Sequence, residues 1–228
     1  MKSMKRSDLL FLLVFIALFA PFFLSNDLYQ WFLRFNSAHP LITAFTKFAI
    51  LATMGEMLGL RIRSKQYNKK GFGIALRALV WGFLGITLYM AFAVFASGTP
   101  VLMGKLGYTT SQAFTNRLLV AFSISTLMNL FYAPVLMTFH KITDMHILSS
   151  QGKPGTFFAS FPMGKYFVNL DWNTHWNFVL KKTIPLFWIP AQTINFMMPE
   201  DFRILIAALY SIVLGVLLSI AGRSAPKN

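Results

Sequence analysis

The chain has no cysteine and little charge. The lack of cysteine excludes disulfides, thiol catalysis, and zinc or iron–sulfur sites with cysteine ligands. Only 12% of the 228 residues are charged and only seven are acidic, whereas about a quarter of the residues of a soluble domain carry charge. The chain also has no glycine-rich nucleotide-binding loop. No serine has a histidine or lysine partner at similar depth in an apolar segment. The sequence therefore predicts neither an enzyme nor a cofactor.

Apolar and basic residues, by contrast, are abundant. Hydrophobic residues make up 56% of the chain, and its 25 phenylalanines exceed what one globular core buries. Lipid is the natural partner of such a surface. The net charge is +14, but the lysines and arginines lie in clusters between apolar runs. This pattern is typical of membrane orientation and not of nucleic-acid binding, which gathers basic residues on one polar face.

Six segments are candidate membrane spans by length and composition. They cover residues 9–24, 41–60, 74–97, 118–139, 183–198 and 203–221. With a cytoplasmic N-terminus, 15 of the 21 lysines and arginines fall in cytoplasmic segments, as the positive-inside rule requires. The sequence thus predicts an all-α polytopic membrane bundle of about six spans with both termini cytoplasmic. We expect it in a bacterial inner membrane or, in a eukaryote, in an organelle membrane.

Two segments have more than one interpretation. The first span resembles a secretory signal, but ALFAP offers no small-x-small cleavage site, and Pro21 would follow any cut after Ala20. We expect this span to be retained. Residues 156–182 mix aromatic side chains with lysines. They are predicted either to lie on the cytoplasmic leaflet or to form a packed loop.

Charged residues within spans need partners, because an unpaired charge at mid-bilayer costs roughly 2.5 to 3.5 kcal/mol. Glu56 lies about 7.5 Å before Arg61, and Arg77 about 9 Å after Gly71, on two helices joined by a short loop. We predict an ion pair between Glu56 and Arg77. A proton or cation site at Glu56 is the alternative. Lys47 lies on the opposite side of its helix from Glu56 and is expected to snorkel, with a pore-lining role as the alternative.

Polar residues gather near mid-depth in two spans. On span four, Ser125 and Asn129 are four residues apart and share a helix face. On span five, Gln192 and Asn195 are three apart and also share a face. Prolines in or beside both spans are expected to break these helices and to free backbone carbonyls, which indicates either a hydrated cavity or interhelical hydrogen bonds that hold the bundle together. These prolines are Pro134, Pro185, Pro190 and Pro199.

The segment HKITDMH, residues 140–146, contains two histidines and an aspartate. Its spacing is neither that of a zinc-binding helix nor that of an acyltransferase motif. We therefore predict that His140, Asp144 and His146 are solvated loop residues and that the chain has no metal site.

The segment around span five contains a series of spaced residues: Trp188, Pro190, Gln192, Asn195, Phe196, Pro199 and Arg203. This series resembles the C-terminal signature of the Mpv-seventeen and twenty-two-kilodalton peroxisomal membrane protein family. Upstream matches at the family's spacing are Pro40, Thr43, Gly55, Glu56, Arg77, Gly82 and Pro134. The chain departs from the family in its third span, where Thr87, Leu88, Ala93 and Val94 replace glycine-proline and tryptophan-tyrosine.

The resemblance covers residues 40–222. It leaves residues 1–39 as an extension with the first span and 223–228 as a cytoplasmic tail. It implies a small integral membrane protein, usually described with four spans, to which weakly selective channel activity for small solutes is ascribed. The departures are those of a distant, bacterial-type member.

We therefore expect a channel-like or small-solute-permeating protein. Ser125, Asn129, Gln192 and Asn195 would line a polar path, and Glu56, Arg77 and Arg203 would hold its walls. The alternative is a non-conducting scaffold or assembly protein in which the same groups join helices. The expected partner is the lipid bilayer, with anionic lipids at the basic face, and a homo-oligomer is compatible with either function.

Overall fold

The computed structural model describes residues 5–108 and 113–224, with side chains up to residue 217. Within these residues every regular element is a helix and no strand occurs. The predicted all-α class is therefore confirmed. By its internal contacts the chain divides into two compact units, residues 1–43 and 44–228. Residues 225–228 of the predicted tail lie outside the described residues.

The first unit contains α1 (Arg6–Leu24), α2 (Asn26–Ala38) and the first residues of α3. α1 is apolar, contains Pro21 and has no buried residue. Ser25 begins α2, because its hydroxyl oxygen accepts a hydrogen bond from the backbone N–H of Leu28 at 3.3 Å. The rings of Phe22 and Phe32 are in contact, with centroids 5.0 Å apart, and join the two helices.

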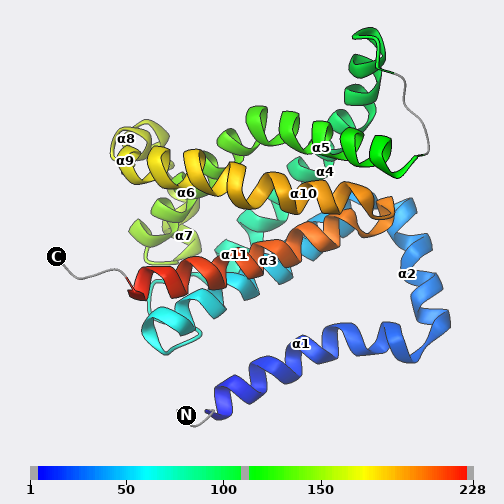
Figure 1. Ribbon diagram of the computed structural model, residues 1–228. Coiled ribbons are helices and arrows are strands. Elements are labelled where there is room, and N and C mark those ends of the chain that lie inside the picture. Colours follow the sequence, from blue (N-terminus) through cyan, green and yellow to red (C-terminus); the bar gives the residue numbers. More distant parts are fainter. Residues whose placement is uncertain (1–4, 109–112, 225–228) are drawn as a thin grey trace. The chain divides into compact units, whose positions relative to one another are not determined.

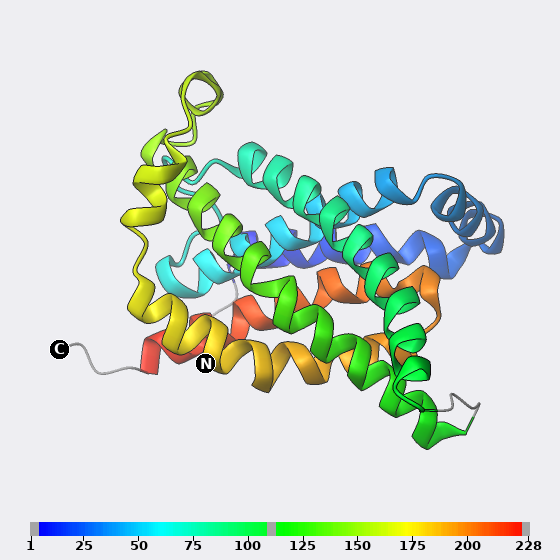
Figure 2. The ribbon, with the colours of Figure 1, turned by 90° about the horizontal axis from the view of Figure 1, so that it is seen from above.

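The second unit contains the rest of α3 and all later helices. Their bounds are α3 Pro40–Ser64, α4 Ile74–Lys105, α5 Phe114–Phe131, α6 Ala133–Ser149, α7 Pro154–Ala159, α8 Met163–Val168, α9 Trp172–Thr174, the π-helix η1 His175–Trp188, α10 Ile189–Met197 and α11 Glu200–Ser224. Figures 1 and 2 show α10 running beside α5, and the two helices contact each other along their length. α4 packs against α5 and α6.

Among the described residues, three helices are long and apolar enough to cross a membrane, namely α1, α3 and α4. A fourth candidate is the pair α5 and α6, which bend by 45° at Tyr132. Pro134 lies in the first turn of α6, two residues beyond the bend. By length and composition the structure thus supports a membrane protein with three to four candidate spans, fewer than the six predicted.

The predicted fifth span is a continuous helical path. Pro185 lies inside η1 and Pro190 in the first turn of α10, which follows η1 without a gap. Neither proline ends the helix, so the predicted break is absent. In an α-helix a proline removes the bond to the carbonyl four residues earlier. Proline has no N–H to donate in either register. η1 continues past Pro185 in the wider π-helical register, in which donors bond five residues back, as in the bond from Ile189 N to Ile184 O.

Glycines allow close packing within the second unit. At Gly85 of α4, an added Cβ would lie 2.7 Å from the backbone oxygen of Ala44 and 2.7 Å from Cβ of Phe48. At Gly55 of α3, it would lie 3.0 Å from Cα of Ile212 in α11. A side chain at either position would push the helices apart, and close backbone approach at small residues is typical of membrane helix pairs.

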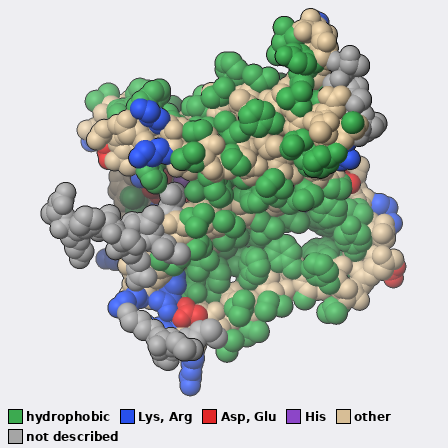
Figure 3. Space-filling view, in the orientation of Figure 1, with side chains coloured by type: hydrophobic (Ala, Val, Ile, Leu, Met, Phe, Trp, Pro, Cys, Tyr) green, Lys and Arg blue, Asp and Glu red, His purple; other side chains and the backbone are tan. Residues whose placement is uncertain are grey.

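The basic connections of the second unit lie at one end of it. The α3–α4 loop, the chain between α6 and η1, and the end of α11 all lie at the left of Figure 1, and the α10–α11 turn lies at the right. Figure 3 shows hydrophobic side chains over much of α5 and α10. Phe131 of α5 is 69% exposed, and Leu186 of η1, the helix that precedes α10, is 77% exposed. Apolar exposure of this extent is typical of a lipid-facing surface.

Candidate functional site

A cavity of about 590 Å³ lies within the second unit. Helices α3, α4, α5, α6, η1, α10 and α11 all contribute to its wall. Its size falls in the range of pockets that bind small molecules, roughly 300 to 1,000 Å³. One side of its lining is exposed and basic, with Arg63, Lys69 and Lys141. The other side is buried, with Leu88, Met128, Asn129 and Gln192. The cavity therefore leads from the basic end of the unit into its core.

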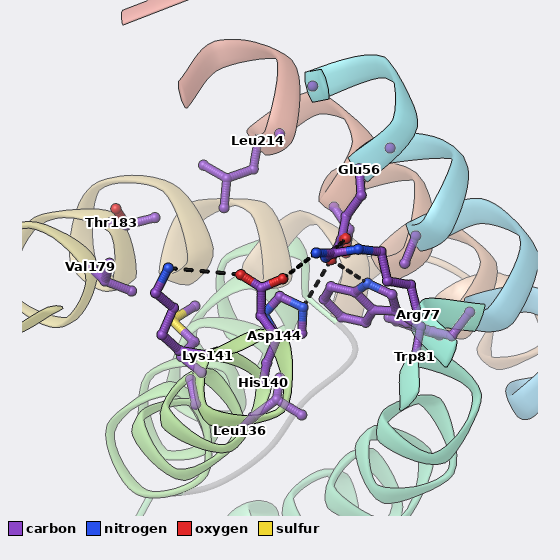
Figure 4. A pocket seen from close by; sticks show the side chains of 18 of the residues that line it. Glu56, Arg77, Trp81, Leu136, His140, Lys141, Asp144, Val179, Thr183 and Leu214 are labelled. Carbon is purple, nitrogen blue, oxygen red and sulfur yellow. Dashed lines mark hydrogen bonds and ion pairs between the residues drawn. The ribbon is translucent and has the colours of Figure 1, made fainter. Parts of the chain in front are cut away.

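Five side chains on the cavity wall form one polar network, which we call the Arg77 cluster: Glu56, Arg77, Trp81, His140 and Asp144 (Figure 4). The Arg77 guanidinium forms ion pairs with both carboxylates, through Nη1 to Glu56 and Nη2 to Asp144. Glu56 Oε1 also accepts a hydrogen bond from Trp81 Nε1 at 2.8 Å and lies 3.0 Å from His140 Nε2. Arg77 is thus shared between two acids from two different helices.

Local structure places Arg77 at the cavity. Gly73, at φ +70°, adopts the left-handed conformation that favours glycine and precedes α4. Arg77 follows in the first turn of α4. Its Nε donates to the carbonyl oxygen of Phe72 at 2.8 Å, and its guanidinium lies 4.3 Å from the centre of the Phe72 ring. The guanidinium is therefore fixed by the chain before α4 as well as by the two acids.

The ion pair predicted between Glu56 and Arg77 is confirmed. The prediction that His140 and Asp144 are solvated loop residues is wrong. Both lie on α6 and are members of the Arg77 cluster. The signal in the sequence was their spacing of four residues, which puts them on one face of a helix.

His146 is also not a solvated loop residue. It is 3% exposed, and its Nδ1 lies 3.0 Å from the Tyr166 hydroxyl and its Nε2 2.8 Å from the carbonyl oxygen of Phe157. No group of three or more metal-ligating side chains occurs among the described residues.

The four residues predicted to line a polar path separate into two pairs. Asn129 and Gln192 line the deep end of the cavity, each 2% exposed. Ser125 and Asn195 do not line it and are fully buried. Ser125 Oγ donates to the carbonyl oxygen of Ile189 at 2.8 Å and so joins α5 to α10. Asn195 Nδ2 donates to Gln192 Oε1 at 2.8 Å and to the carbonyl oxygen of Arg203 at 2.9 Å, which joins α10 to α11.

The two remaining charged candidates lie away from the cavity. Lys47 is 9% exposed and interacts electrostatically with Asp201. That its ammonium group reaches the lipid headgroups stays a prediction. The Arg203 guanidinium donates to the carbonyl oxygens of Met198 and Phe196 at the end of α10, at 3.3 and 3.5 Å, and lies over the Phe196 ring. Arg203 therefore caps α10 instead of lining a path.

The other residues of the family resemblance have mainly packing contacts. In the first unit, Pro40 begins α3, and Thr43 Oγ1 donates to Asn36 Oδ1 at 3.0 Å. In the second unit, a Cβ added at Gly82 would lie 2.4 Å from the Phe45 ring, and the centroids of the Phe196 and Phe92 rings are 5.0 Å apart. Gly55 packs against Ile212, and Trp188 lies on the cavity wall. Pro134 and Pro190 lie in the first turns of α6 and α10, and the carbonyl oxygen of Pro199 accepts from Phe202 N.

His175 joins the cavity lining from the basic side. It is 4% exposed, and its Nε2 lies 2.9 Å from Thr138 Oγ1 of α6. Burial, and to a smaller extent the charge of Lys141, lowers the pKa of His175 below its ordinary value. The lowered pKa favours the neutral form of this imidazole, so His175 adds little positive charge to the lining.

The geometry can hold and orient a small solute, with charged groups at the entrance, apolar walls, and two amides at the deep end. Comparisons of the chain with protein-family models, with curated proteins and with solved structures found no match.

Proposed function

We propose that this chain is an integral membrane protein that lets small solutes enter or cross the bilayer through the cavity of its second unit. The observation that carries the proposal is the continuous lining from exposed Lys69 and Lys141 to buried Asn129 and Gln192. Asn129 Nδ2 donates to the carbonyl oxygen of Ser125 at 2.9 Å, and Gln192 Oε1 accepts from Asn195 Nδ2 at 2.8 Å. Each amide has a further polar atom on the cavity wall, with which water or a solute would form hydrogen bonds. The proposal involves no chemical reaction and no cofactor.

The charged side chains of the cavity lining influence which solutes enter the cavity. The lining contains Arg63, Lys69, Arg77 and Lys141 against Glu56 and Asp144. Arg77 is engaged by both acids, and Lys141 Nζ lies 3.8 Å from Asp144 Oδ2. Four cations nevertheless stand against two carboxylates in the lining, so its positive charge exceeds its negative charge. We propose that anionic or neutral solutes enter more readily than cations.

The topology that we propose has six spans and both termini on the cytoplasmic side, in a bacterial inner membrane or an organelle membrane. It rests on the basic connections, which lie at one end of the second unit, and on the positive-inside rule. The membership that we propose, in the Mpv-seventeen and twenty-two-kilodalton peroxisomal membrane protein family, rests on the sequence matches alone.

The test is solute flux into liposomes that contain the purified protein, with chloride, succinate, glucose and potassium as probes. Leu88→Trp should reduce flux, because Leu88 lines the deep end and a larger side chain would fill it. Val94→Trp is the matched control, since Val94 is on the same helix, is 64% exposed and is not part of the lining. Absence of flux for all four probes, or equal flux in both variants, would refute the proposal.

A second candidate function is a non-conducting scaffold. It is favoured by Ser125 and Asn195, which are fully buried and bond to the backbone of neighbouring helices. Such bonds stabilise membrane bundles by about 0.6 to 2 kcal/mol each. In this case Asn129→Leu and Leu88→Trp would change stability or oligomeric state without changing permeability.

A further inference from the structure

The chain between α6 and the middle of η1, residues 154–182, exposes an unusual number of large apolar side chains. We call it the aromatic segment. It includes α7, α8, α9 and the first part of η1. Phe158 is 67% exposed and Val168 is 77% exposed. The other exposed large side chains of the segment are Phe161, Met163, Phe167, Trp172, Trp176 and Phe178.

The aromatic segment is attached to α6, so its exposed side chains are not those of a detached loop. On its inner side, buried His146 of α6 binds the Tyr166 hydroxyl and the carbonyl oxygen of Phe157, at 3.0 and 2.8 Å. Further along, His175 binds Thr138 of α6 at 2.9 Å. Three contacts made by two histidines therefore tie the segment to α6, and its outer apolar side is a fixed feature of the fold.

The charges of the aromatic segment and its flank are mostly positive. Lys153, Lys165, Lys181 and Lys182 are exposed, and none forms an ion pair among the described residues. The one acid in the segment is Asp171, whose carboxylate accepts from Thr174 N at 3.0 Å and caps α9. Figure 3 shows basic and hydrophobic side chains next to each other over the region of α8 and α9.

The occupant of this surface follows from its composition and place. Aromatic side chains beside lysines match the boundary between acyl chains and anionic headgroups, where rings prefer the interface and ammonium groups meet phosphates. The same chain has three to four candidate membrane spans, and the segment lies at the end of the second unit that holds its basic connections. A protein partner of this surface would need matching acidic groups, and this chain has only seven acids in all. A second copy is therefore a poor partner.

We propose that the aromatic segment lies in the headgroup layer of the membrane and binds anionic lipid, with its aromatic side chains at the acyl boundary and its lysines on lipid phosphates. This inference is independent of solute permeation, because a scaffold protein would use the same surface.

The experiment uses the full chain, which has no cysteine, so that one introduced cysteine carries an environment-sensitive fluorophore. The test position is Val168→Cys, and the control is Asn68→Cys in the exposed loop between α3 and α4. Vesicles contain phosphatidylcholine and phosphatidylglycerol, and in two parallel preparations one or the other lipid carries brominated acyl chains that quench the fluorophore. We expect blue-shifted emission at position 168 and stronger quenching by the brominated anionic lipid.

Lysine substitutions test the source of that preference. The variant with Lys165→Gln, Lys181→Gln and Lys182→Gln should lose the preference for anionic lipid, because each lysine near the surface changes lipid partitioning by roughly fivefold. The matched control removes the same charge from the α3–α4 loop through Lys65→Gln, Lys69→Gln and Lys70→Gln, and should keep the preference. High salt should weaken it in the parent protein.

Three outcomes would overturn the proposal. The first is water-like emission at position 168 without quenching by either lipid. The second is equal quenching by both lipids that the lysine substitutions leave unchanged. The third is quenching that falls as the ratio of protein to lipid rises, since this would show that a second copy covers the surface and excludes the brominated lipid. Flux in liposomes is a separate readout, so failure here and failure of permeation are distinguishable.

Discussion

Arg77→Gln should be the most destabilising single substitution in the Arg77 cluster. Its guanidinium is 7% exposed and holds two carboxylates, Glu56 and Asp144, which are 17% and 18% exposed. Removing one partner of a buried ion pair costs about 3 to 5 kcal/mol, because the charge left behind has no compensation. We expect a loss in that range for Arg77→Gln, since two negative charges then remain on one wall.

The acids should matter less than the arginine. After Glu56→Gln, Arg77 still has Asp144 and the Phe72 carbonyl oxygen, so the loss should be about 2 kcal/mol, near that of one hydrogen bond to a charged group. Asp144 has fewer buried partners than Glu56, because its only ion-pair partner beside Arg77, in the part of the chain that the structure describes, is the exposed Lys141. After Asp144→Asn, Arg77 keeps Glu56, so the loss should be about 1 kcal/mol. The expected order is therefore Arg77→Gln, then Glu56→Gln, then Asp144→Asn.

The assay is the free energy of unfolding of the purified protein in mixed micelles, measured by titration with a denaturing detergent. The double variant Glu56→Gln with Arg77→Gln completes a thermodynamic cycle and should show a coupling energy of about 1 kcal/mol or more. The reasoning fails if Arg77→Gln costs no more than either acid substitution, or if the effects of Glu56→Gln and Arg77→Gln simply add.

Three further predictions use matched pairs or a pH series. Gly85→Ala should cost about 1 to 3 kcal/mol of unfolding free energy, because the added Cβ overpacks against Ala44 and Phe48. Gly98→Ala should be near neutral, because a Cβ at this position meets no atom within 4 Å. Both variants are measured by detergent unfolding. Trp188→Phe should be neutral or stabilising, because the buried Nε1 of Trp188 has no hydrogen-bond partner among the described residues. Trp81→Phe, by contrast, removes a hydrogen bond to Glu56 and should cost about 1 to 3 kcal/mol in the same assay. Because the pKa of His175 is lowered in the folded protein, the unfolded chain binds its proton at higher pH, so stability should fall as pH drops below about 6.5. Unfolding at a series of pH values should show a smaller loss in His175→Gln, and an unchanged slope would contradict the assignment.

Several features of the fold were predictable because they depend on residues near one another in sequence. Apolar runs of sufficient length specify helices that lipid can surround, and α1, α3 and α4 match three of the predicted spans. The pair of Glu56 and Arg77 was predictable for a similar reason. A short loop makes the two helices antiparallel, so distances along each helix determine relative depth.

Other features depended on contacts between distant segments. The helical path through Pro185 could not be predicted, because the sequence rules for proline assume α-helical hydrogen bonding and η1 uses a wider register. Asp144 and His140 appeared to be loop residues because their partners lie more than 60 residues earlier in the chain. Nothing local to HKITDMH indicates that α6 faces Arg77.

The four polar residues of α5 and α10 show the same limit of prediction from sequence. Helical spacing places Ser125 with Asn129 and Gln192 with Asn195, and each pair does share a helix. Spacing does not determine which member faces a cavity and which faces a neighbouring helix. In the structure Asn129 and Gln192 face the cavity, and Ser125 and Asn195 bond to the backbone of adjacent helices.

By itself, the sequence determined that this chain is helical, apolar enough for a membrane, and basic in its connections, because composition and periodicity act locally along the chain. Only the tertiary structure decided that Arg77 joins two acids, that two histidines hold an aromatic segment against α6, and that a cavity of about 590 Å³ reaches two buried amides. Those features depend on how helices distant in sequence rotate and pack against one another, which the order of residues within each helix does not specify.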